Sequence, residues 1–524
     1  MAEESKVVDE TTAPPAEEAS SSSSAAVDAA QAAAESIVPG VDMSQPVGKL
    51  DRKTMDQIIK MNPGLRAETQ GKDPAAVQKM LETMKLGELL AGMATGKNAK
   101  DMANYKFWQT QPVPRFDDNE SKQQEEGEIK KVDPAQVPKD PAPLLDDFTW
   151  CTVDLDNEEE LKEVYTLLNG HYVEDDEAMF RFAYSPAFFK WALKPPGWKK
   201  EWHVGVRVKA SNRLVAFISA IPLTLKVRAA TLNCSEVNFL CVHKKLRGKR
   251  LAPVLIREVT RRCNVEGIWQ ALYTGGAVLP TPISSCRYYH RSLDWLKLHE
   301  VGFSPMPPNS TKAKQITKYA LPSETKVPGL RPMQEKDVAE VKSLLDRYLG
   351  RFDMAPIFSE EEVKHWFLHH GEEKDEDRVI WTYVVEDPET HKVTDFFNFY
   401  CLESSVINNS KHGMIKAAYL FYYASETVFA SYKDNDAMKA GLKKRLNELM
   451  QDGLIEAKKM NFDVFNALTL LDNVLFLGDQ KFGAGDGQLH YYLYNYRTAP
   501  ISGGMNNKMG LDEKFGSGIG MVML

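Results

Sequence analysis

The sequence has no apolar run of about eighteen residues, the length at which a stretch begins to predict a membrane-crossing helix. We therefore predict no transmembrane segment. The chain begins MAEESKVVDE, which is acidic and polar and so resembles neither a secretory signal nor a transit peptide. Together these absences predict a cytoplasmic protein.

The usual signatures of a metal site are also missing. The six cysteines are scattered and form no CxxC pair, so in a chain of this size we expect reduced core thiols. His365 and His369 stand four apart in HWFLHH, but no glutamate lies between them as the HExxH motif requires. We therefore predict no metal ion. The cysteines are Cys151, Cys234, Cys241, Cys263, Cys286 and Cys401.

An excess of positive charge is absent as well. The chain has 65 Lys and Arg against 73 Asp and Glu, a formal net charge of −8, which argues against polyanion binding in general. One basic cluster precedes Arg257, Arg261 and Arg262, but it lacks interleaved aromatic residues. We expect no nucleic-acid partner, although the cluster could still bind a phosphate group.

Composition divides the chain into parts. Residues 1–48 are rich in Ala, Ser, Glu and Pro, and we expect them to be disordered. Residues 49–103 are expected to form a weakly helical arm. The aromatic island YKFW, residues 105–108, suggests an arm that docks onto a core. From Phe148 onward, amphipathic helical patterns and alternating strand patterns predict a mixed α and β fold.

A faint repeat runs through the folded part. The segment LKEVYTLLNGHYV is similar to VAEVKSLLDRYLG, and SPAFFKWAL is similar to SEEEVKHWFL. This pairing makes Trp191 and Trp366 equivalent positions, about 175 residues apart. We interpret the pattern as a diverged tandem of one αβ unit, with the halves 104–308 and 309–524; chance similarity is the alternative.

The strongest local motif is NFLCVHKKLRGKRLAPVLI. An apolar strand leads into a turn with five cationic side chains and then into a helix, so backbone N–H groups and positive charge are combined as in phosphate sites. The turn resembles the pyrophosphate loop R-x-x-G-x-G/A of the acetyltransferase-like fold, with Arg247 first and Ala252 last. Arg250 stands where that pattern has glycine. The alternative is a solvated basic turn.

Several longer motifs carry a more specific resemblance. EVNFLCVHKKLRGKRLAPVLIREVTRR, YKFWQTQPVPRF, YHRSLDWLKLHEVGFS, DVFNAL and KFGAGDGQLHYYLYN resemble the N-myristoyltransferase (glycylpeptide N-tetradecanoyltransferase) family in family order over roughly residues 100–524. The N-terminal extension is similar to that of fungal members. The resemblance implies an α/β fold with a mixed sheet, built from two tandem acetyltransferase-like (GNAT-type) halves related by a pseudo-twofold. The first half would bind acyl-CoA and the second the peptide.

The resemblance implies myristoyl-CoA as a co-substrate and no tightly bound cofactor. Plain core packing is the alternative for the aromatic members of the implied acyl-CoA site. That site comprises Tyr105, Lys106, Phe107, Trp108, Phe239, Leu240, Cys241, Val242, Arg247, Gly248, Lys249, Arg250, Leu251 and Ala252.

The implied catalytic groups are Phe239, Leu240 and Leu524. The backbone N–H groups of the first two would form an oxyanion hole, since a strand end leaves such groups unpaired. The C-terminal carboxylate of Leu524 would be the base, in a tail whose glycines give flexibility and whose last four residues are apolar. A frayed chain end is the alternative.

The implied peptide site is less sharply defined. Its acidic run departs from relatives that have an aspartate at position 177, and that run could equally be a solvated loop. GAGDG, residues 483–487, is expected to be a turn between packed segments. The site comprises Tyr172, Asp175, Asp176, Glu177, Phe180, Phe182, Tyr184, Thr274, Gly276, Tyr288, His290 and Asp486.

We therefore expect a monomeric acyltransferase that acts on proteins with an N-terminal glycine, or on their nascent chains. Two other functions stay open at this point. One is an N-acetyltransferase of the same fold, which would need only a shallow acyl pocket. The other is a non-catalytic module that binds acyl-CoA or lipid tails.

Overall fold

The computed structural model describes residue 102 and residues 105–116, 125–173, 179–369, 378–407 and 409–524. The predicted extension 1–48 and nearly all of the predicted arm 49–103 lie outside these described residues. Contacts divide the chain into Met1–Gln109 with Arg115–Asp118, and Thr110–Pro114 with Asn119–Leu524. We call the second of these the main unit.

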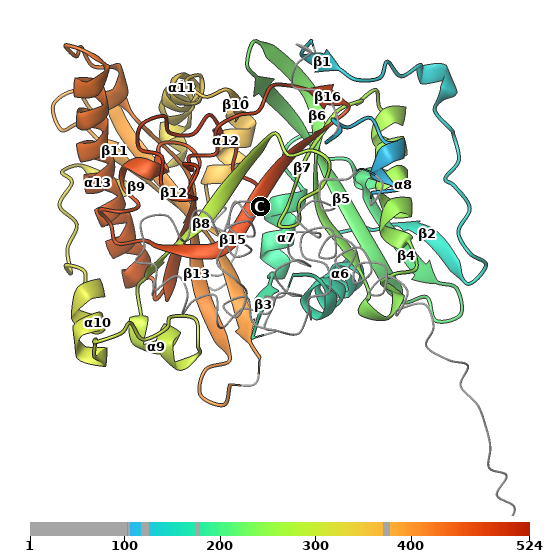
Figure 1. Cartoon of the computed structure of the whole chain (residues 1–524), viewed down its shortest axis with the longest axis horizontal. Coiled ribbons are helices and arrows are strands. Elements are labelled where there is room, and N and C mark those ends of the chain that lie inside the picture. The colour runs from blue at the N-terminus through green and yellow to red at the C-terminus, as the bar shows by residue number, and fades with distance from the viewer. Residues whose placement is uncertain (1–101, 103–104, 117–124, 174–178, 370–377, 408) are drawn as a thin grey trace, which may run out of the picture. The chain divides into compact units, whose positions relative to one another are not determined.

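One 14-stranded mixed sheet runs through the main unit (Figure 1). Its main path has the order β2-β4-β5-β6-β7-β15-β8-β14-β13-β12-β11-β9, while β10 pairs with β5 and β3 with β12. The strands are β2 (Phe148–Thr152), β3 (Phe180–Ala183), β4 (His203–Val208), β5 (Leu214–Val227), β6 (Ala230–Val242), β7 (Ala271–Gly275), β8 (Ser284–Ser292), β9 (Leu330–Pro332), β10 (Met354–Pro356), β11 (Ile380–Glu386), β12 (Val393–Val406), β13 (Met414–Ser425), β14 (Val464–Leu468) and β15 (Gly483–Tyr494). A separate ribbon pairs β1 (Gly127–Glu128) with β16 (Tyr496–Arg497).

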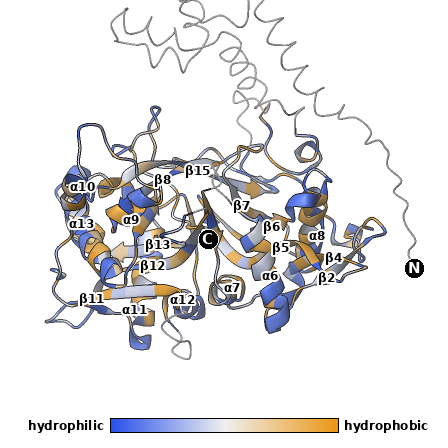
Figure 2. Cartoon of the chain, turned by 90° about the horizontal axis from the view of Figure 1, so that it is seen from below, coloured by the Kyte–Doolittle hydropathy of each residue, from blue (hydrophilic) through white to orange (hydrophobic). Residues whose placement is uncertain are grey.

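Helices cover the sheet and are amphipathic, with apolar and polar residues mixed along them (Figure 2). In the first half, α6 and α8 lie on opposite faces of β5, because Phe217 packs with the α6 side and its neighbour Ile218 with the α8 side. The helices are α6 (Glu158–His171), α7 (Pro186–Leu193), α8 (Leu251–Val265), α9 (Trp295–Glu300), α10 (Lys312–Tyr319), α11 (Val338–Leu349), α12 (Glu360–Phe367) and α13 (Asn435–Lys459).

Local sequence explains where several helices begin. The Asn157 side chain accepts hydrogen bonds from the N–H groups of Glu159 and Glu160 at the start of α6. Ser359 and Glu362 form a reciprocal capping box at the start of α12. These caps satisfy N–H groups that have no partner within the helix.

The element order confirms the tandem repeat. The first half runs β2-α6-β3-α7-β4-β5-β6-α8-β7-β8, and the second runs β9-α11-β10-α12-β11-β12-β13-α13-β14-β15. Even the sheet pairings match, because β6–β7 and β13–β14 are both parallel while the other pairs are antiparallel. The fold is therefore the mixed α/β fold with two similar halves that the sequence predicts.

The two halves exchange their last strands. β8 of the first half pairs with β14 of the second, β15 of the second pairs with β7 of the first, and β8 and β15 pair with each other at the centre. β3 and β10 also cross over, to β12 and β5. Each half therefore completes the sheet of the other.

The equivalent tryptophans of the repeat meet where the halves join. Trp191 of α7 and Trp366 of α12 lie edge to face with ring centroids 5.1 Å apart. Both belong to one hydrophobic core that takes residues from both halves and from the C-terminal segment. This shared core makes each half depend on the other for stability.

We expect Trp366→Ala to lower the free energy of unfolding by about 3–5 kcal/mol, because it opens a cavity in that shared core. Leu145→Ala, at a side chain that is 72% exposed, is the control and should change it by less than about 0.5 kcal/mol. Denaturant unfolding followed by circular dichroism and by fluorescence measures both. Two separate transitions, with only one moved by Trp366→Ala, would contradict the shared core.

Candidate active site

A β-bulge interrupts the pairing of β5 with β6. Phe217 pairs with Cys241 and Ser219 with Asn238, so two residues of β6, Phe239 and Leu240, stand opposite the single residue between. Phe239 adopts the left-handed conformation with φ 57°, which is rare for a bulky side chain. At the bulge the Phe239 N–H donates to the Tyr172 hydroxyl, a side-chain acceptor outside the ladder.

This position differs from the expected one. The sequence prediction placed the released N–H groups at a strand end, whereas β6 continues beyond Leu240 to Val242. The interruption of the ladder comes from an extra residue in β6, which β5 cannot pair.

An aromatic cluster surrounds the bulge. The Phe239 ring lies 5.3 Å from Tyr184, 5.5 Å from Phe189 and 6.0 Å from Tyr172, measured between ring centroids. Burial raises the pKa of Tyr172, while the Phe239 N–H donates a hydrogen bond to its hydroxyl and acts in the opposite direction. One of the two predicted oxyanion donors thus already holds a hydroxyl oxygen, which shows that it can bind an oxygen acceptor.

The basic turn joins the end of β6 to the start of α8. Arg250 adopts the left-handed conformation with φ 60° directly before the first residue of α8, and its side chain makes no cap hydrogen bond. Glycine takes that conformation without steric cost, which explains why the acetyltransferase pattern has glycine there. Arg247 donates to the carbonyl oxygen of His171, and Arg247, Gly248, Lys249 and Arg250 are exposed. Leu251 and Ala252, half-buried, open α8.

The aromatic island, residues 105–108, belongs to the smaller unit. The Tyr105 ring lies 5.6 Å from that of Phe116, and the Phe107 ring lies 5.1 Å from that of Trp108. Lys106 between them is exposed. Directly after the island the chain enters the main unit, where the Asn495 N–H donates to the Pro112 carbonyl at 2.8 Å.

The C-terminal segment is buried at the centre of the main unit, among strands of both halves (Figures 1 and 2). Met521, Val522 and Met523 are 3–5% exposed, and Leu524 is half-buried. The Tyr491 hydroxyl donates to the Met521 carbonyl at 2.9 Å, and the Val522 N–H donates to the Tyr422 hydroxyl at 3.1 Å. The tail is thus held by specific hydrogen bonds, so the alternative of a frayed end is excluded.

Close packing, not flexibility, explains two of the tail glycines. A Cβ on Gly520 would lie 3.0 Å from the Phe352 Cβ and 3.1 Å from the Ala355 Cβ. A Cβ on Gly518 would lie 2.6 Å from a methyl group of Ile501. The backbone is bound to β10 of the same half at this place, since the Gly520 N–H donates to the Met354 carbonyl at 2.7 Å. The predicted role of these glycines as flexible joints is therefore wrong.

The structure gathers several predicted peptide-site residues near the bulge. Tyr184 lies 5.9 Å from both Tyr172 and Phe182, and Tyr288 also contributes to the raised pKa of Tyr172 and of Tyr184. Phe180, on β3 with Phe182, packs on Phe303 at 5.8 Å. Thr274 lies on β7 opposite Tyr491, and Gly276 follows that strand near the Gln488 carbonyl. Asp175, Asp176 and Glu177 lie outside the described residues.

His290 is fixed by its neighbours. Its Nδ1 lies 2.7 Å from the Asn466 Oδ1, and its ring stacks 6.5 Å from that of Tyr288. Burial lowers the pKa of His290, while the Asn466 hydrogen bond and the charge of Asp486 act in the opposite direction. GAGDG is a bulge within β15, with Gly485 against His290, and not the predicted turn between segments.

Comparison with known proteins identifies the family. The models of the N-terminal and C-terminal domains of myristoyl-CoA:protein N-myristoyltransferase match residues 128–286 and 300–522. The chain is 60% identical to the glycylpeptide N-tetradecanoyltransferase of Aspergillus fumigatus over 90% of this chain and 94% of that protein. It is 49% identical to the Saccharomyces cerevisiae enzyme, over 86% and 98%. The chain belongs to the N-myristoyltransferase family.

A solved structure of this family supports the assignment. Saccharomyces cerevisiae N-myristoyltransferase with bound myristoyl-CoA aligns with a TM-score of 0.78 at 50% identity, covering 80% of this chain and 95% of that one. The chain is therefore an enzyme of the acyltransferase class. Over the described residues, no helix is long and apolar enough to cross a membrane, and no group of three or more His, Cys, Asp or Glu could hold a metal ion.

Sequence reasoning missed the residues that anchor the tail and the bulge. Tyr422 and Tyr491 each lie among other aromatic residues of their strands, and no spacing shows that the C-terminus meets them. Ser219, Glu236 and Asn238, next to the bulge, were likewise given no role. The available signal was Glu236, a lone acid within a strand that was predicted to be buried.

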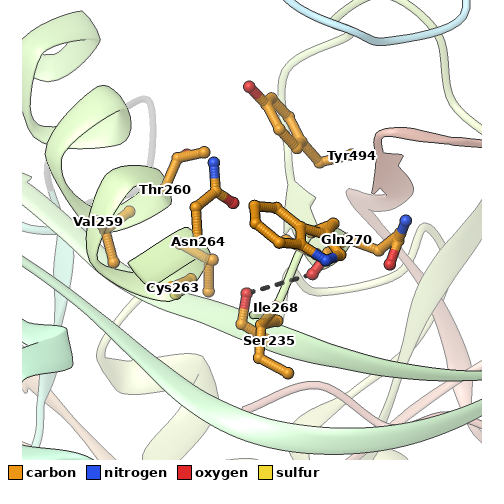
Figure 3. A pocket seen from close by; sticks show the side chains of 11 residues that line it. Ser235, Val259, Thr260, Cys263, Asn264, Ile268, Gln270 and Tyr494 are labelled. Carbon is orange, nitrogen blue, oxygen red and sulfur yellow. Dashed lines mark hydrogen bonds between the residues drawn. The ribbon is translucent and has the colours of Figure 1, made fainter. Parts of the chain in front are cut away.

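A small cavity lies beside the middle of β6, between α8, β7 and β15 (Figure 3). Its volume is about 20 Å³, which accommodates a water molecule but not an acyl chain. The Ser235 hydroxyl donates to the Gln270 carbonyl at 3.5 Å along its wall. Polar side chains of Thr260, Asn264 and Tyr494 also line it. The cavity fits a structural water and is no acyl site.

We expect Gly520→Val to displace the tail, because its added carbons would overlap Phe352 and Ala355. The free energy of unfolding should fall by about 1–3 kcal/mol. Carboxypeptidase digestion followed by mass spectrometry should show that Leu524, Met523 and Val522 are removed from this variant. The unsubstituted chain should retain all three. Gly413→Val is the control, since nothing lies within 4 Å of its added carbon. Equal resistance of both variants would contradict the tight packing.

Proposed function

We propose that this chain transfers myristate from myristoyl-CoA to the N-terminal glycine amine of protein substrates by direct attack of the amine on the thioester. The observation that carries the proposal is the burial of the C-terminal segment at the strand crossing, in the same core as the β6 bulge. Tyr422 links the two places, because its hydroxyl accepts from the Val522 N–H and its pKa is affected, after burial, by the charge of Glu236, three residues before Phe239. The family membership supplies the two substrates.

The reaction begins with loss of a proton from the substrate ammonium group, whose pKa is about 8. The carboxylate of Leu524 takes this proton, and an apolar environment of the kind that Val522 and Met523 provide makes a carboxylate a stronger base. The neutral amine then attacks the carbonyl carbon of the thioester. The C–N bond forms, the C–S bond breaks, and the second proton of the nitrogen leaves with the sulfur as the thiol of CoA.

The oxyanion of the intermediate would be held by the N–H groups of Phe239 and Leu240. Each such donor contributes about 3 kcal/mol to the transition state in enzymes where it has been removed. The thioester oxygen would replace the Tyr172 hydroxyl at the Phe239 N–H. The left-handed geometry of Phe239 supports this role, because a strained residue retained in a bulge is typical of functional sites.

The phosphates of CoA would lie on the basic turn and on the first N–H groups of α8, from Arg247 to Ala252. A helix of 15 residues with an uncapped N-terminus and adjacent cations favours phosphate there. The aromatic island at 105–108 and Cys241 and Val242 would line the acyl-CoA path. Burial of a fourteen-carbon chain gives roughly 10 kcal/mol of gross transfer energy, enough to distinguish it from acetyl.

The peptide would bind along β3, β7 and β8, against the tyrosine cluster and His290. These elements belong to residues 104–308, and Asp486 on β15 is the peptide-site residue from 309–524. The predicted division into an acyl-CoA half and a peptide half is therefore replaced in this proposal by a peptide site where β8 and β15 of the two halves pair. The monomeric state and the cytoplasmic location predicted from the sequence stay predictions.

Replacing the C-terminal carboxylate by a carboxamide tests the base most sharply, because every side chain stays in place. We expect the single-turnover rate of myristoyl transfer to a glycine-leading peptide to fall by about 10²-fold or more, with myristoyl-CoA affinity unchanged. The same chain, assembled by the same ligation with its natural carboxylate, is the control.

An unchanged rate in the carboxamide protein would contradict the assignment of the base and direct the search to His290. Tight acyl-CoA binding without any transfer by the intact chain would instead favour a non-catalytic binding module. Transfer of acetyl as fast as myristoyl would favour an N-acetyltransferase.

A further inference from the structure

Glu236 is the one acidic residue of β6. It is 5% exposed, and the residues directly opposite it on β5 and β7 are Ile221 and Leu272, which are buried and point to the same face of the sheet. Its carboxylate accepts a hydrogen bond from the Asn238 Nδ2 at 2.7 Å. No cation pairs with Glu236 in the part of the chain that the structure describes.

Asn238 is the residue before the bulge, and it is held at two points. Its side chain is bound by Glu236, and its carbonyl oxygen accepts a hydrogen bond from the hydroxyl of Ser219 at 2.9 Å. Ser219 is fully buried on β5 and is the strand partner of Asn238. The carbonyl of Asn238 and the N–H of Phe239 belong to the same peptide plane. Fixing Asn238 therefore fixes the direction of the Phe239 N–H.

We propose that Ser219 and Glu236 are positioning residues of the acyl-transfer site, which hold the Asn238–Phe239 peptide so that its N–H points at the thioester oxygen. This inference rests on the proposed function, because it specifies how the proposed oxyanion donor is oriented. Neither residue touches the substrate in this scheme. Both act through Asn238.

Protonation of Glu236 changes what it offers to Asn238. An ionised carboxylate only accepts, so it selects the Nδ2 side of the amide, whereas a protonated carboxyl can also donate and so bind the Oδ1 side. Burial raises the pKa of Glu236 to about 7, while the Asn238 hydrogen bond acts in the opposite direction. The orientation of Asn238, and with it the transfer rate, should therefore titrate near neutral pH.

The titratable groups around Glu236 come from three elements. Cys234 lies two residues before it on β6, and burial followed by the charge of Glu236 raises the pKa of that thiol. Tyr422 of β13 is also affected by the charge of Glu236, after the larger effect of burial. Through Tyr422, which binds the Val522 N–H, the C-terminal carboxylate belongs to the same neighbourhood. On β5 and β7, the residues directly opposite Glu236 are Ile221 and Leu272, which do not titrate.

The test compares the pH profiles of single-turnover transfer from myristoyl-CoA to a glycine-leading peptide. Ser219→Ala should lower the rate about tenfold at every pH with an unchanged KM, because it removes one hydrogen bond and no titrating group. Glu236→Gln should remove the inflection near pH 7, since glutamine offers a donor and an acceptor at all pH values. Asn238→Ala should also remove that inflection, because the amide through which Glu236 acts is lost.

Matched controls come from the second half. Burial also raises the pKa of Glu403 on β12, and Ser425 on β13 is a fully buried serine that donates to Asp395. Glu403→Gln and Ser425→Ala should leave the shape of the pH profile unchanged. If Glu236→Gln keeps the inflection and Ser219→Ala keeps the full rate, the positioning proposal is overturned.

A measurement without turnover separates this proposal from the proposed function. In a chain labelled with ¹⁵N-phenylalanine, Ser219→Ala and Glu236→Gln should each shift the Phe239 amide signal, whether or not the protein transfers myristate. An unmoved Phe239 signal in both variants would overturn the proposal by itself. This readout also applies if Asn238→Ala fails to fold.

Thermal unfolding gives a second independent readout. The pKa of Glu236 is higher in the folded state than in the unfolded state, so ionisation destabilises the fold as pH rises from about 4.5 to about 7. Glu236→Gln should therefore raise Tm above pH 7 and leave it unchanged below about pH 4.5. A Tm lowered equally at all pH values would show that Glu236 has a plain packing role.

Discussion

The pairing of β8 with β14 and of β15 with β7 is the constraint on which the rest of the structure depends. Because each half lends its last strand to the other, one sheet and one core extend across both. The chain end then reaches the centre of this sheet, where Tyr422 and Tyr491 bind it. The tail is thus placed among strands distant in sequence by topology and not by closeness in sequence.

Two groups near the bulge are retained at a cost to stability. The left-handed conformation of Phe239 costs about 1–3 kcal/mol, which burial of its ring, at about 1.5–3 kcal/mol, can offset. Glu236 is ionised at the upper end of the neutral range although its surroundings disfavour the charge. Both groups contact Asn238, because Phe239 follows it in the chain and Glu236 binds its side chain. The strained residue and the buried acid therefore both adjoin the Asn238–Phe239 peptide, which carries the proposed oxyanion donor. Sites of catalysis commonly combine such features.

The sequence predicted features that depend on local pattern. The mixed fold, the tandem halves, the basic turn and the apolar tail all follow from periodicity, internal similarity or composition. The exchange of strands could not be predicted, because an apolar strand pattern does not name its partner. The bulge at Phe239 could not be predicted either, because the register shift that defines it exists only when β6 pairs with β5. Gly518 and Gly520 were misread because their need for small size comes from Phe352, Ala355 and Ile501, distant in sequence.

In the proposed reaction the N–H groups of Phe239 and Leu240 hold the thioester carbonyl oxygen. The carbonyl stretching frequency of bound myristoyl-CoA, labelled with ¹³C at the thioester carbon, measures this directly. Strong hydrogen bonds from the protein weaken the C=O bond, so the account predicts a lower frequency in the complex than in free myristoyl-CoA, and a smaller shift in the Ser219→Ala variant. A frequency equal to or above that of free myristoyl-CoA would contradict it.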